Sequence, residues 1–172
     1  MKLKLMQTPE VEPMVVQHLL RHLGEVLPCE VSEGGSFILH PAEFDPERGQ
    51  YSAPTVLRRL EKSVREEESL LAVVGEDLFA PGLNFVFGEA DRRGRCAIIS
   101  LYRLRATYPG QELTTRLFRH RVLTEGVHEV GHLLGLAHCR EPSCVMHFSN
   151  SLSETDRKKA EPCPECRALL PK

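Results

Sequence analysis

The spacing of apolar positions near the start of the chain predicts a strand followed by a helix. Apolar residues recur with helical spacing between positions 11 and 23, at Val15, Val16, Leu19, Leu20 and Leu23. We expect a short strand before this helix, at residues 2–5. A second strand, bounded by turns that contain Gly and Pro, is expected within residues 32–41.

The middle of the chain predicts another helix and then three strands. Ser52 can cap the helix, and its apolar face is expected to be formed by Val56, Leu57, Leu60 and Val64. Residues 70–74 are continuously apolar, as in a strand that is buried on both faces. In residues 84–88, Phe85 and Phe87 would lie on one side of a strand and Val86 on the other, and residues 96–104 are a third candidate strand.

A long helix is predicted from Thr114 or Thr115 to Gly135. Its apolar stripe is formed by Leu123, Val127, Val130 and Leu134. Because strands alternate with helices, we expect an α/β domain of layered elements with a mixed sheet. Residues 1–172 form one domain in this interpretation: residues 1–135 carry the sheet and the long helix, and residues 136–172 form a short cysteine-rich segment.

The overall charge argues against two classes of partner. The chain has 22 Lys and Arg against 24 Asp and Glu, which gives a formal net charge of −2. Proteins that bind nucleic acid or anionic membranes are usually basic, so neither partner is expected. The local cluster of Arg116, Arg119 and Arg121 is interpreted as a solvated helix face.

Cysteine usage agrees with a reducing compartment. The chain has no apolar stretch of membrane-spanning length, and its start lacks the apolar core of a signal peptide, so a cytoplasmic protein is expected. In such a compartment the six cysteines are better interpreted as metal ligands or free thiols than as disulfides. Cys29 and Cys96 are expected to be buried as small apolar residues.

The stretch HEVGHLLGLAH, residues 128–138, has the spacing of a zinc site. His128 and His132 are four residues apart, so both imidazoles leave the same face of a helix. Gly135 can take the left-handed conformation that ends a helix, and His138 can then turn towards the same metal. Three protein ligands leave a fourth position open for water, as catalytic zinc sites require.

Glu129 is the candidate catalytic residue of this site. It is rotated by about a quarter turn from His128, so it can reach a zinc-bound water without binding the metal. We expect Glu129 to take the proton as that water attacks a carbonyl and to pass it to the leaving amine. The alternative is a buried helix whose histidines are merely hydrogen-bonded, which the glycine and the third histidine make less favourable.

Four cysteines indicate a second zinc site. Cys139, Cys144, Cys163 and Cys166 combine a C-x4-C pair with a C-x2-C knuckle of the structural-zinc kind. The alternatives are a redox pair at Cys163 and Cys166, or buried thiols. In an extended chain the adjacent side chains of His138 and Cys139 point in opposite directions, so one residue step can serve both metals. His147 lies close to both sites in the sequence and has no assigned role.

These residues together resemble the archaemetzincins, a family of the metzincin clan of zinc peptidases. His128, Glu129, His132, Gly135 and His138 match the clan motif, and the four cysteines with Met146 match the extended family motif. The stretches RGQY (48–51) and GLNFVFG (82–88) are similar more loosely.

The resemblance implies a compact fold with a twisted mixed sheet, a backing helix and an active-site helix. It implies that Met146 forms an apolar base, the Met-turn, beneath the catalytic metal. It also implies that an extended peptide adds to an edge strand formed by Asn84, Phe85, Val86, Phe87 and Gly88. Some metzincins have a tyrosine two residues after this methionine that can touch the metal, whereas Phe148 stands here.

The sequence therefore favours a monomeric zinc-dependent peptidase that carries two zinc ions, one catalytic and one structural. Its expected partners are peptide or protein substrates, whose identity the sequence does not give. Two alternatives remain: a protein of peptidase fold that binds peptides without cleaving them, and a zinc-knuckle adaptor. Glu129 favours the peptidase, because a protein that only binds needs no base beside the metal.

Overall fold

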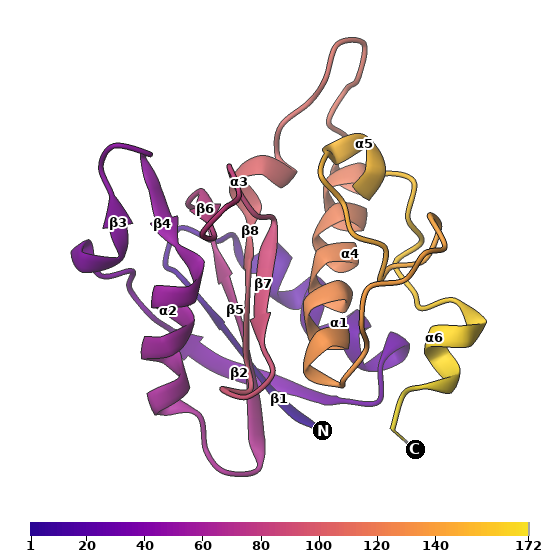
Figure 1. The fold of residues 1–172 in the computed structure, drawn as a ribbon, viewed down its shortest axis with the longest axis horizontal. Helices are drawn as coiled ribbons and strands as arrows, with labels where there is room; N and C mark the ends of the chain where they lie inside the picture. Colours follow the sequence, from indigo (N-terminus) through magenta and orange to yellow (C-terminus); the bar gives the residue numbers. More distant parts are fainter. Residues whose placement is uncertain (172) are drawn as a thin grey trace.

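A computed structural model describes residues 1–171 and contains a central sheet covered by helices on both faces (Figure 1). The elements follow in the order β1 (Lys2–Gln7), α1 (Pro13–Val26), β2 (Glu30–Ser36), β3 (Phe44–Asp45), β4 (Gln50–Ser52), α2 (Ala53–Leu60), β5 (Glu68–Val74), β6 (Leu78–Phe79), β7 (Gly88–Asp91), β8 (Cys96–Ser100), α3 (Leu101–Leu104), α4 (Thr115–Leu133), α5 (Leu152–Thr155) and α6 (Pro164–Ala168). Short 3-10 turns follow β2 and α2, at Pro41–Glu43 and Glu61–Ser63.

The main sheet has five strands in the order β2-β1-β5-β8-β7. The first four are parallel to one another, and β7 pairs with β8 in the antiparallel direction. β7 therefore forms one edge of the sheet. A small second sheet contains β3, β4 and β6. The prediction of a layered α/β fold with a mixed sheet is confirmed.

The two faces of the main sheet carry two separate apolar clusters. In β5, Leu71 and Val73 pack with residues of α1 and α4, whereas Leu70, Ala72 and Val74 pack with residues of α2. All five side chains are buried, because successive strand residues point to opposite faces and helices cover both. This explains why the sequence is continuously apolar here.

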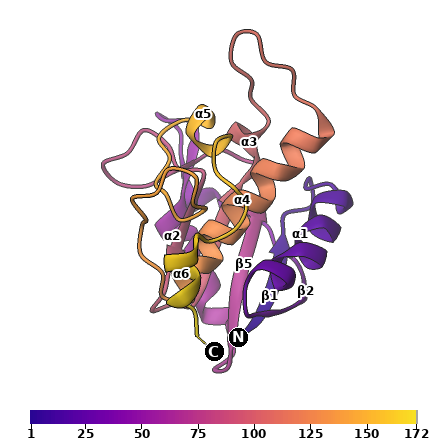
Figure 2. The same cartoon turned by 90° about the vertical axis from the view of Figure 1, so that its right-hand side faces the viewer.

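The C-terminal segment shares the larger of these clusters. It runs alongside α4, with α5 and α6 as its short helices (Figures 1 and 2). Val145 and Met146 are completely buried in the cluster that also contains Leu3 and Leu19 from the N-terminal part. None of the helices in the described part of the chain is long and apolar enough to cross a membrane.

Three of the expected strands are wrong in extent. The strand expected within residues 32–41 runs from Glu30 to Ser36. The edge strand expected at residues 84–88 begins only at Gly88. Residues 84–87 form a loop, in which Val86 makes a single bridge to Leu78. The strand expected at 96–104 ends at Ser100, because the Ser100 hydroxyl accepts a hydrogen bond from the Tyr102 N–H and starts α3.

Candidate active site

The long helix α4 carries the histidines and ends where the motif requires. The Thr114 hydroxyl accepts a hydrogen bond from the Leu117 N–H and caps its start. At its end Gly135 has a φ of +98°, a conformation that favours glycine. The N–H groups of Gly135 and Leu136 donate to the carbonyls of His132 and Gly131, which closes the helix and reverses the chain.

This reversal brings three imidazoles together. His128, His132 and His138 each offer a nitrogen, and these atoms lie within 4.8 Å of one another. His128 is buried, His132 is partly buried and His138 is exposed, so the cluster opens to solvent on one side. Burial, assisted by Lys158 and His132, holds the pKa of His128 well below its usual value. The pKa values of His132 and His138 are also lowered, mainly by burial, so all three rings favour the neutral form that binds metals.

The hydrogen bonds of two rings show that this cluster fits a cation. The Nδ1 atoms of His128 and His132 lie 2.7 Å from the Val145 carbonyl and 2.8 Å from the Leu136 carbonyl, so each Nδ1–H donates. In the neutral rings both Nε2 atoms then carry bare lone pairs, yet these atoms face each other at 3.2 Å. Two nitrogens bound to one tetrahedral zinc lie about 3.3 Å apart, so a zinc ion fits between them.

Glu129 lies beside the histidines, deep against the edge strand. It is 5% exposed. A Cβ added at Gly88 would lie 2.7 Å from the Glu129 Oε1, which shows how closely β7 approaches this carboxylate. Burial, together with the nearby carboxylates of Glu125 and Glu89, holds the pKa of Glu129 well above its usual value, while Lys158 acts in the opposite direction. A carboxylate with a raised pKa is suited to accept a proton during catalysis.

Met146 lies beneath the active-site helix. It is completely buried, and its sulfur would be 2.5 Å from a Cβ added at Gly131 of α4. Its carbonyl accepts a hydrogen bond from the Cys139 N–H at 2.9 Å. Met146 therefore supports α4 between the two histidines and also holds the chain that carries His138 and Cys139.

The four cysteines of the C-terminal segment form a second cluster. Their sulfurs lie within 4.8 Å of one another, with Cys139–Cys163 and Cys144–Cys166 Sγ–Sγ distances of 3.8 Å. A disulfide requires about 2.05 Å, whereas two sulfurs on one tetrahedral zinc lie about 3.8 Å apart. The cluster thus fits a closed thiolate zinc site. The backbone N–H groups of Glu141 and Cys163 donate to the sulfurs of Cys139 and Cys144, which stabilises thiolates.

One residue step joins the two clusters. His138 belongs to the histidine group and Cys139, the next residue, belongs to the cysteine group. Cys139 pairs with His147 in an isolated parallel bridge, so the chain is extended at this point. Side chains of adjacent residues in an extended chain point in opposite directions, which gives each cluster one donor.

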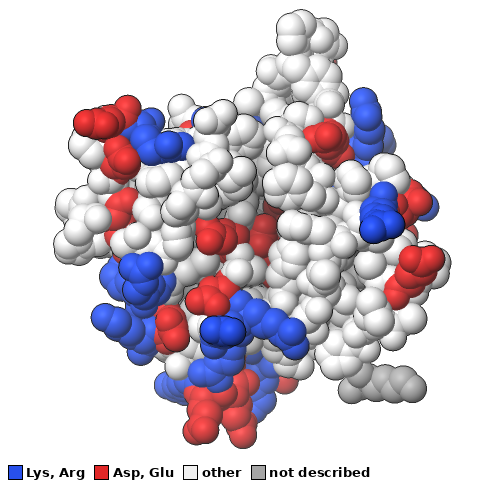
Figure 3. Space-filling model, in the orientation of Figure 1, with Lys and Arg blue, Asp and Glu red and all other residues white. Residues whose placement is uncertain are grey.

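A cleft runs past the histidines along the edge of the sheet. A cavity of about 330 Å³ is lined on one side by residues 82–88 and on the other by Phe148, Ser149 and Asn150. A second hollow of about 580 Å³ continues past His132 and His138. Figure 3 shows uncharged surface on both sides of a central hollow, with acidic side chains inside it.

The loop that lines this cleft is held by the RGQY stretch. Arg48 donates hydrogen bonds to the carbonyls of Leu83 and Asn84, at 2.8 and 3.0 Å. Gln50 donates to the Asn84 carbonyl at 3.1 Å and to Asp77 at 2.9 Å. The two stretches that are only loosely similar to the archaemetzincins are therefore in direct contact, and one positions the other.

Two charged residues that line the cavity were not identified from the sequence. Glu125 and Lys158 both line it, and the Lys158 Nζ lies 3.5 Å from the Glu125 Oε1. Glu125 had a signal in the sequence, because it precedes Glu129 by one helical turn and shares its face. Lys158 had none, because its contact with Glu125 spans 33 residues and forms only when the chain returns from the Met146 region.

The remaining candidate residues lie outside both clusters. Cys96 is buried, as expected, and Cys29 is half-buried. Burial raises the pKa of Cys29 to about 11 and that of Cys96 to about 12, so both stay protonated thiols. The His147 Nδ1 lies 3.0 Å from the Cys139 carbonyl, which helps to hold the connecting chain. Phe148 packs against His138, with ring centroids 5.1 Å apart.

Sequence comparison finds relatives along most of the chain. The model of peptidase family M54 matches residues 41–172. The archaemetzincin of Methanopyrus kandleri is 41% identical over 154 residues, which cover 90% of this chain and 82% of that protein. The archaemetzincin of Archaeoglobus fulgidus is 37% identical over 166 residues, which cover 93% and 96%.

Structure comparison finds the same group. The crystal structure of the Archaeoglobus fulgidus archaemetzincin complexed with malonate has a TM-score of 0.84 at 35% identity, covering 99% of this chain and 100% of that one. A zinc-dependent peptidase from Methanocorpusculum labreanum has a TM-score of 0.88 at 32% identity, covering 98% and 100%.

Proposed function

This chain belongs to peptidase family M54, the archaemetzincins, and is a zinc metallopeptidase; from that premise we propose that it hydrolyses peptide bonds with Glu129 as its general base. The position of Glu129 carries the proposal. Its carboxylate is buried beside three converging imidazoles, it is not one of the grouped metal ligands, and its pKa is raised. Family membership favours this function over the binding protein and the adaptor.

Two zinc ions per chain are part of this proposal. His128, His132 and His138 would hold the catalytic ion, and the four cysteines would hold the structural one. When bound, the catalytic zinc lowers the pKa of water and polarises a carbonyl oxygen. The Nδ1–H donors of His128 and His132 stay on the Val145 and Leu136 carbonyls, which keeps both rings oriented towards the metal.

The chain itself supplies the proton transfer. Glu129 would accept the proton of the attacking water and return it to the leaving amine. Its burial between α4 and β7 keeps it in place and excludes bulk solvent. Glu125 and Glu89 raise its affinity for the proton, which suits a group that must hold a proton between the two halves of the reaction.

The substrate would lie as an extended segment along the sheet edge. β7 ends the sheet, so its outer edge can pair with the main chain of a peptide. Asn84, Phe85, Val86, Phe87 and Gly88 line the adjoining cavity and are proposed to contact it. Arg48 and Gln50 fix the start of this stretch and so set its distance from Glu129.

The Glu129→Ala variant tests the proposed role of Glu129. We expect wild type to cleave members of a broad peptide library, read by mass spectrometry, and the variant to cleave none above background. Because Glu129 acts as base and not as ligand, the variant should retain both zinc ions and the fold, checked by elemental analysis and thermal unfolding.

Two outcomes contradict the proposal. Loss of one zinc in Glu129→Ala would show that this residue helps to bind the metal. If wild type and variant each hold two zinc ions and neither cleaves any peptide of the library, the site does not cleave peptides.

Three further expectations belong to the same proposal. The six free thiols favour a reducing compartment, in agreement with a cytoplasmic location. We expect a monomer, which size-exclusion chromatography with light scattering would check. Residues 1–135 and 136–172 are proposed to act as subdomains of one domain, because Val145 and Met146 lie in the core built by the N-terminal part.

A further inference from the structure

The cavity beside Glu129 has a charged pair in its lining. Glu125 and Lys158 face each other there, with side chains 4% and 1% exposed. Buried charges of this kind are rare unless they are paired, and each keeps a strong need for hydrogen-bond partners. Phe85, Phe87 and Phe148 line the same cavity, so part of its wall is apolar and can contact the stem of a side chain.

The pair is not saturated by the protein. A lysine ammonium has three N–H donors, and within residues 1–171 Lys158 has two partners: Glu125 at 3.5 Å and the His147 carbonyl at 3.2 Å. Glu125 receives its two long hydrogen bonds, from Lys158 and Thr155, on Oε1 alone. The Ser149 hydroxyl, which lines the same cavity, is buried without a partner in this part of the chain.

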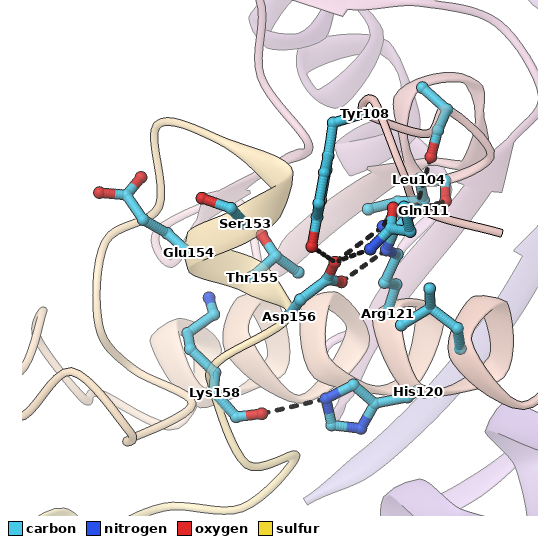
Figure 4. Close-up of polar contacts among 12 residues, drawn as sticks. Leu104, Tyr108, Gln111, His120, Arg121, Ser153, Glu154, Thr155, Asp156 and Lys158 are labelled. Atoms are coloured by element: carbon cyan, nitrogen blue, oxygen red, sulfur yellow. Dashed lines mark hydrogen bonds and ion pairs between the residues drawn. The ribbon is translucent and has the colours of Figure 1, made fainter. Parts of the chain in front are cut away.

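Both members of the pair are held in fixed positions. Glu125 is on α4. Lys158 follows α5 on the returning chain, as Figure 4 shows. The Lys158 carbonyl lies 3.0 Å from the His120 Nε2. Two residues earlier, Asp156 accepts hydrogen bonds from the buried Arg121 at 2.6 and 2.8 Å. The donor and the acceptor that remain free are therefore preorganised.

We propose that this cavity binds the substrate side chain next to the scissile bond and selects an apolar stem with an uncharged hydrogen-bonding end, such as glutamine. The inference rests on the proposed peptidase function, because the same cavity is lined by His128 and Glu129. An amide end has both a donor, for the Glu125 Oε2, and an acceptor, for the third Lys158 N–H.

Charge and solvation exclude the other side-chain classes. An apolar end of the same length displaces water from Glu125 and Lys158 and leaves their free hydrogen-bonding atoms unpaired. An acidic end pairs with Lys158 and is repelled by Glu125. A basic end pairs with Glu125 and is repelled by Lys158. The pair is neutral as a whole, so only a neutral polar end satisfies both members without leaving one charge unpaired.

The test compares four side chains of similar length: glutamine, glutamate, methionine and lysine. Each is placed next to the scissile bond of one peptide, and each is also placed next to the metal-binding group of a short peptide hydroxamate. For wild type we expect glutamine to exceed each of the other three by about tenfold or more, both in kcat/KM and in hydroxamate affinity.

Two variants should shift this preference in opposite directions. Glu125→Gln leaves the Lys158 charge alone, so glutamate should become the preferred side chain. Lys158→Met leaves the Glu125 charge alone, so lysine should become preferred. Glu47→Gln and Lys159→Met, which make the same changes on exposed side chains outside the cavity, should keep the wild-type order. Ratios between side chains within one protein are unaffected by a loss of folded or metal-loaded enzyme.

The two readouts separate this proposal from the proposed function. The selective cavity would be supported, even if no peptide were cleaved, by two results together. Wild type would bind the glutamine hydroxamate most tightly, and the preference would shift to glutamate in Glu125→Gln and to lysine in Lys158→Met. Cleavage with equal rates for the four side chains, or shifts of both variants in the same direction, would overturn the selective cavity and leave the peptidase standing. Hydroxamate affinities that are equal for all four side chains would also overturn it.

Discussion

Gly88 shows how little free space surrounds the Glu129 carboxylate. A Cβ at this position would lie 2.7 Å from the Glu129 Cγ and Oε1 and 2.8 Å from the Ile98 carbonyl. Real Cβ atoms do not approach other atoms so closely, so either β7 or Glu129 would have to move. The residue type at position 88 therefore sets the position of Glu129, the proposed general base.

The Gly88→Ala variant should lose both activity and stability. We expect kcat/KM to fall by about 10²-fold, since displacements near 1 Å have this effect on catalytic geometry. The free energy of unfolding should fall by about 1–3 kcal/mol through overpacking. Peptide hydrolysis and urea unfolding would measure both.

A double variant shows whether Glu129 or the Ile98 carbonyl causes the destabilisation in Gly88→Ala. In the Glu129→Ala background the nearest clashing side chain is absent, so adding Gly88→Ala should destabilise the protein less than it does in wild type. Equal destabilisation in both backgrounds would place the clash at the Ile98 carbonyl and not at Glu129.

At the residue scale, local spacing predicted what lies on one element. His128, Glu129 and His132 share a helix, so their relative placement followed from its periodicity alone. Arg121 was misinterpreted for the opposite reason: the sequence suggested a solvated face, but the side chain is completely buried and donates to Asp156, Gln111 and two carbonyls. Nothing near position 121 indicates partners that lie 10 to 35 residues away.

At the element scale, α4 and the C-terminal segment depend on each other unequally. α4 is anchored in the main core by Val127 and Val130, both completely buried. The segment after Met146 contributes little to that core, and ordering its backbone costs about 1–2 kcal/mol per residue. Zinc binding to the four cysteines, on the order of 10 kcal/mol, would supply much of the difference.

Loss of each metal site should therefore have a different structural effect. His132→Ala should abolish activity and leave the protein resistant to limited proteolysis. Cys163→Ser should expose cleavage sites within residues 139–144 and 159–171, and should also abolish activity because Cys139 adjoins His138. Cys29→Ser, outside the cluster, is the matched control and should resist.

Equal resistance of His132→Ala and Cys163→Ser would show that the cysteine cluster does not hold the segment. Mass spectrometry of the fragments locates each cut, so the two variants are compared at the level of single peptide bonds.

Arg121 joins three elements. After the cysteine cluster, it is the second group that holds the C-terminal segment in place. Its five N–H donors are all used, by Asp156 next to α5, by Gln111 and by the carbonyls of Leu104 and Ala106 (Figure 4). It thus ties α4 to α5 and to the base of the projecting loop at residues 105–114, seen at the top of Figures 1 and 2.

The Arg121→Met variant should lose about 3–5 kcal/mol of unfolding free energy, because Asp156 and the carbonyls of Leu104 and Ala106 lose the guanidinium that binds them. Arg119→Met, on an exposed position of the same helix, should lose less than about 0.5 kcal/mol. Urea unfolding at pH 7 would measure both. A similar loss in the two variants would mean that the buried network does not stabilise the fold.

The elements themselves were predicted unevenly, and the reasons are physical. Residues 70–74 had a clear signal, because both faces of β5 are covered. Residues 84–88 alternate like a strand, yet Val86 bonds to Leu78, and Arg48 and Gln50 hold the Asn84 carbonyl. These contacts come from a different sheet and from a side-chain network, neither of which leaves a periodic signal in the sequence.

At the scale of the whole molecule, the thiols divide into two populations. Burial raises the pKa of Cys29 to about 11 and of Cys96 to about 12, so at pH 8 about one Cys29 in a thousand is a thiolate. The other four would be thiolates bound to zinc. Neither population presents a free, reactive thiolate in the loaded protein.

Alkylation by iodoacetamide at pH 8 should therefore leave the metal-loaded protein unmodified. Chelation should remove the order of the segment that carries the four zinc cysteines, so these four should react, with Cys29 and Cys96 still protected. Because a raised pKa delays ionisation, the reactivity of Cys29 should increase only as the pH rises towards 11. Peptide mapping would assign each site, and modification of Cys29 before chelation would contradict its burial.

The adjacency of His138 and Cys139 also limits how this family of chains can change in length. A single residue inserted between them would turn every following side chain to the other face of the extended segment, so one cluster or the other would lose its donor. Surface loops such as residues 105–114 are expected to tolerate insertions. An insertion between His138 and Cys139 would instead remove a ligand from one of the two clusters. The histidine motif and the cysteine motif must therefore stay directly adjacent in the chain, with no residue inserted between His138 and Cys139.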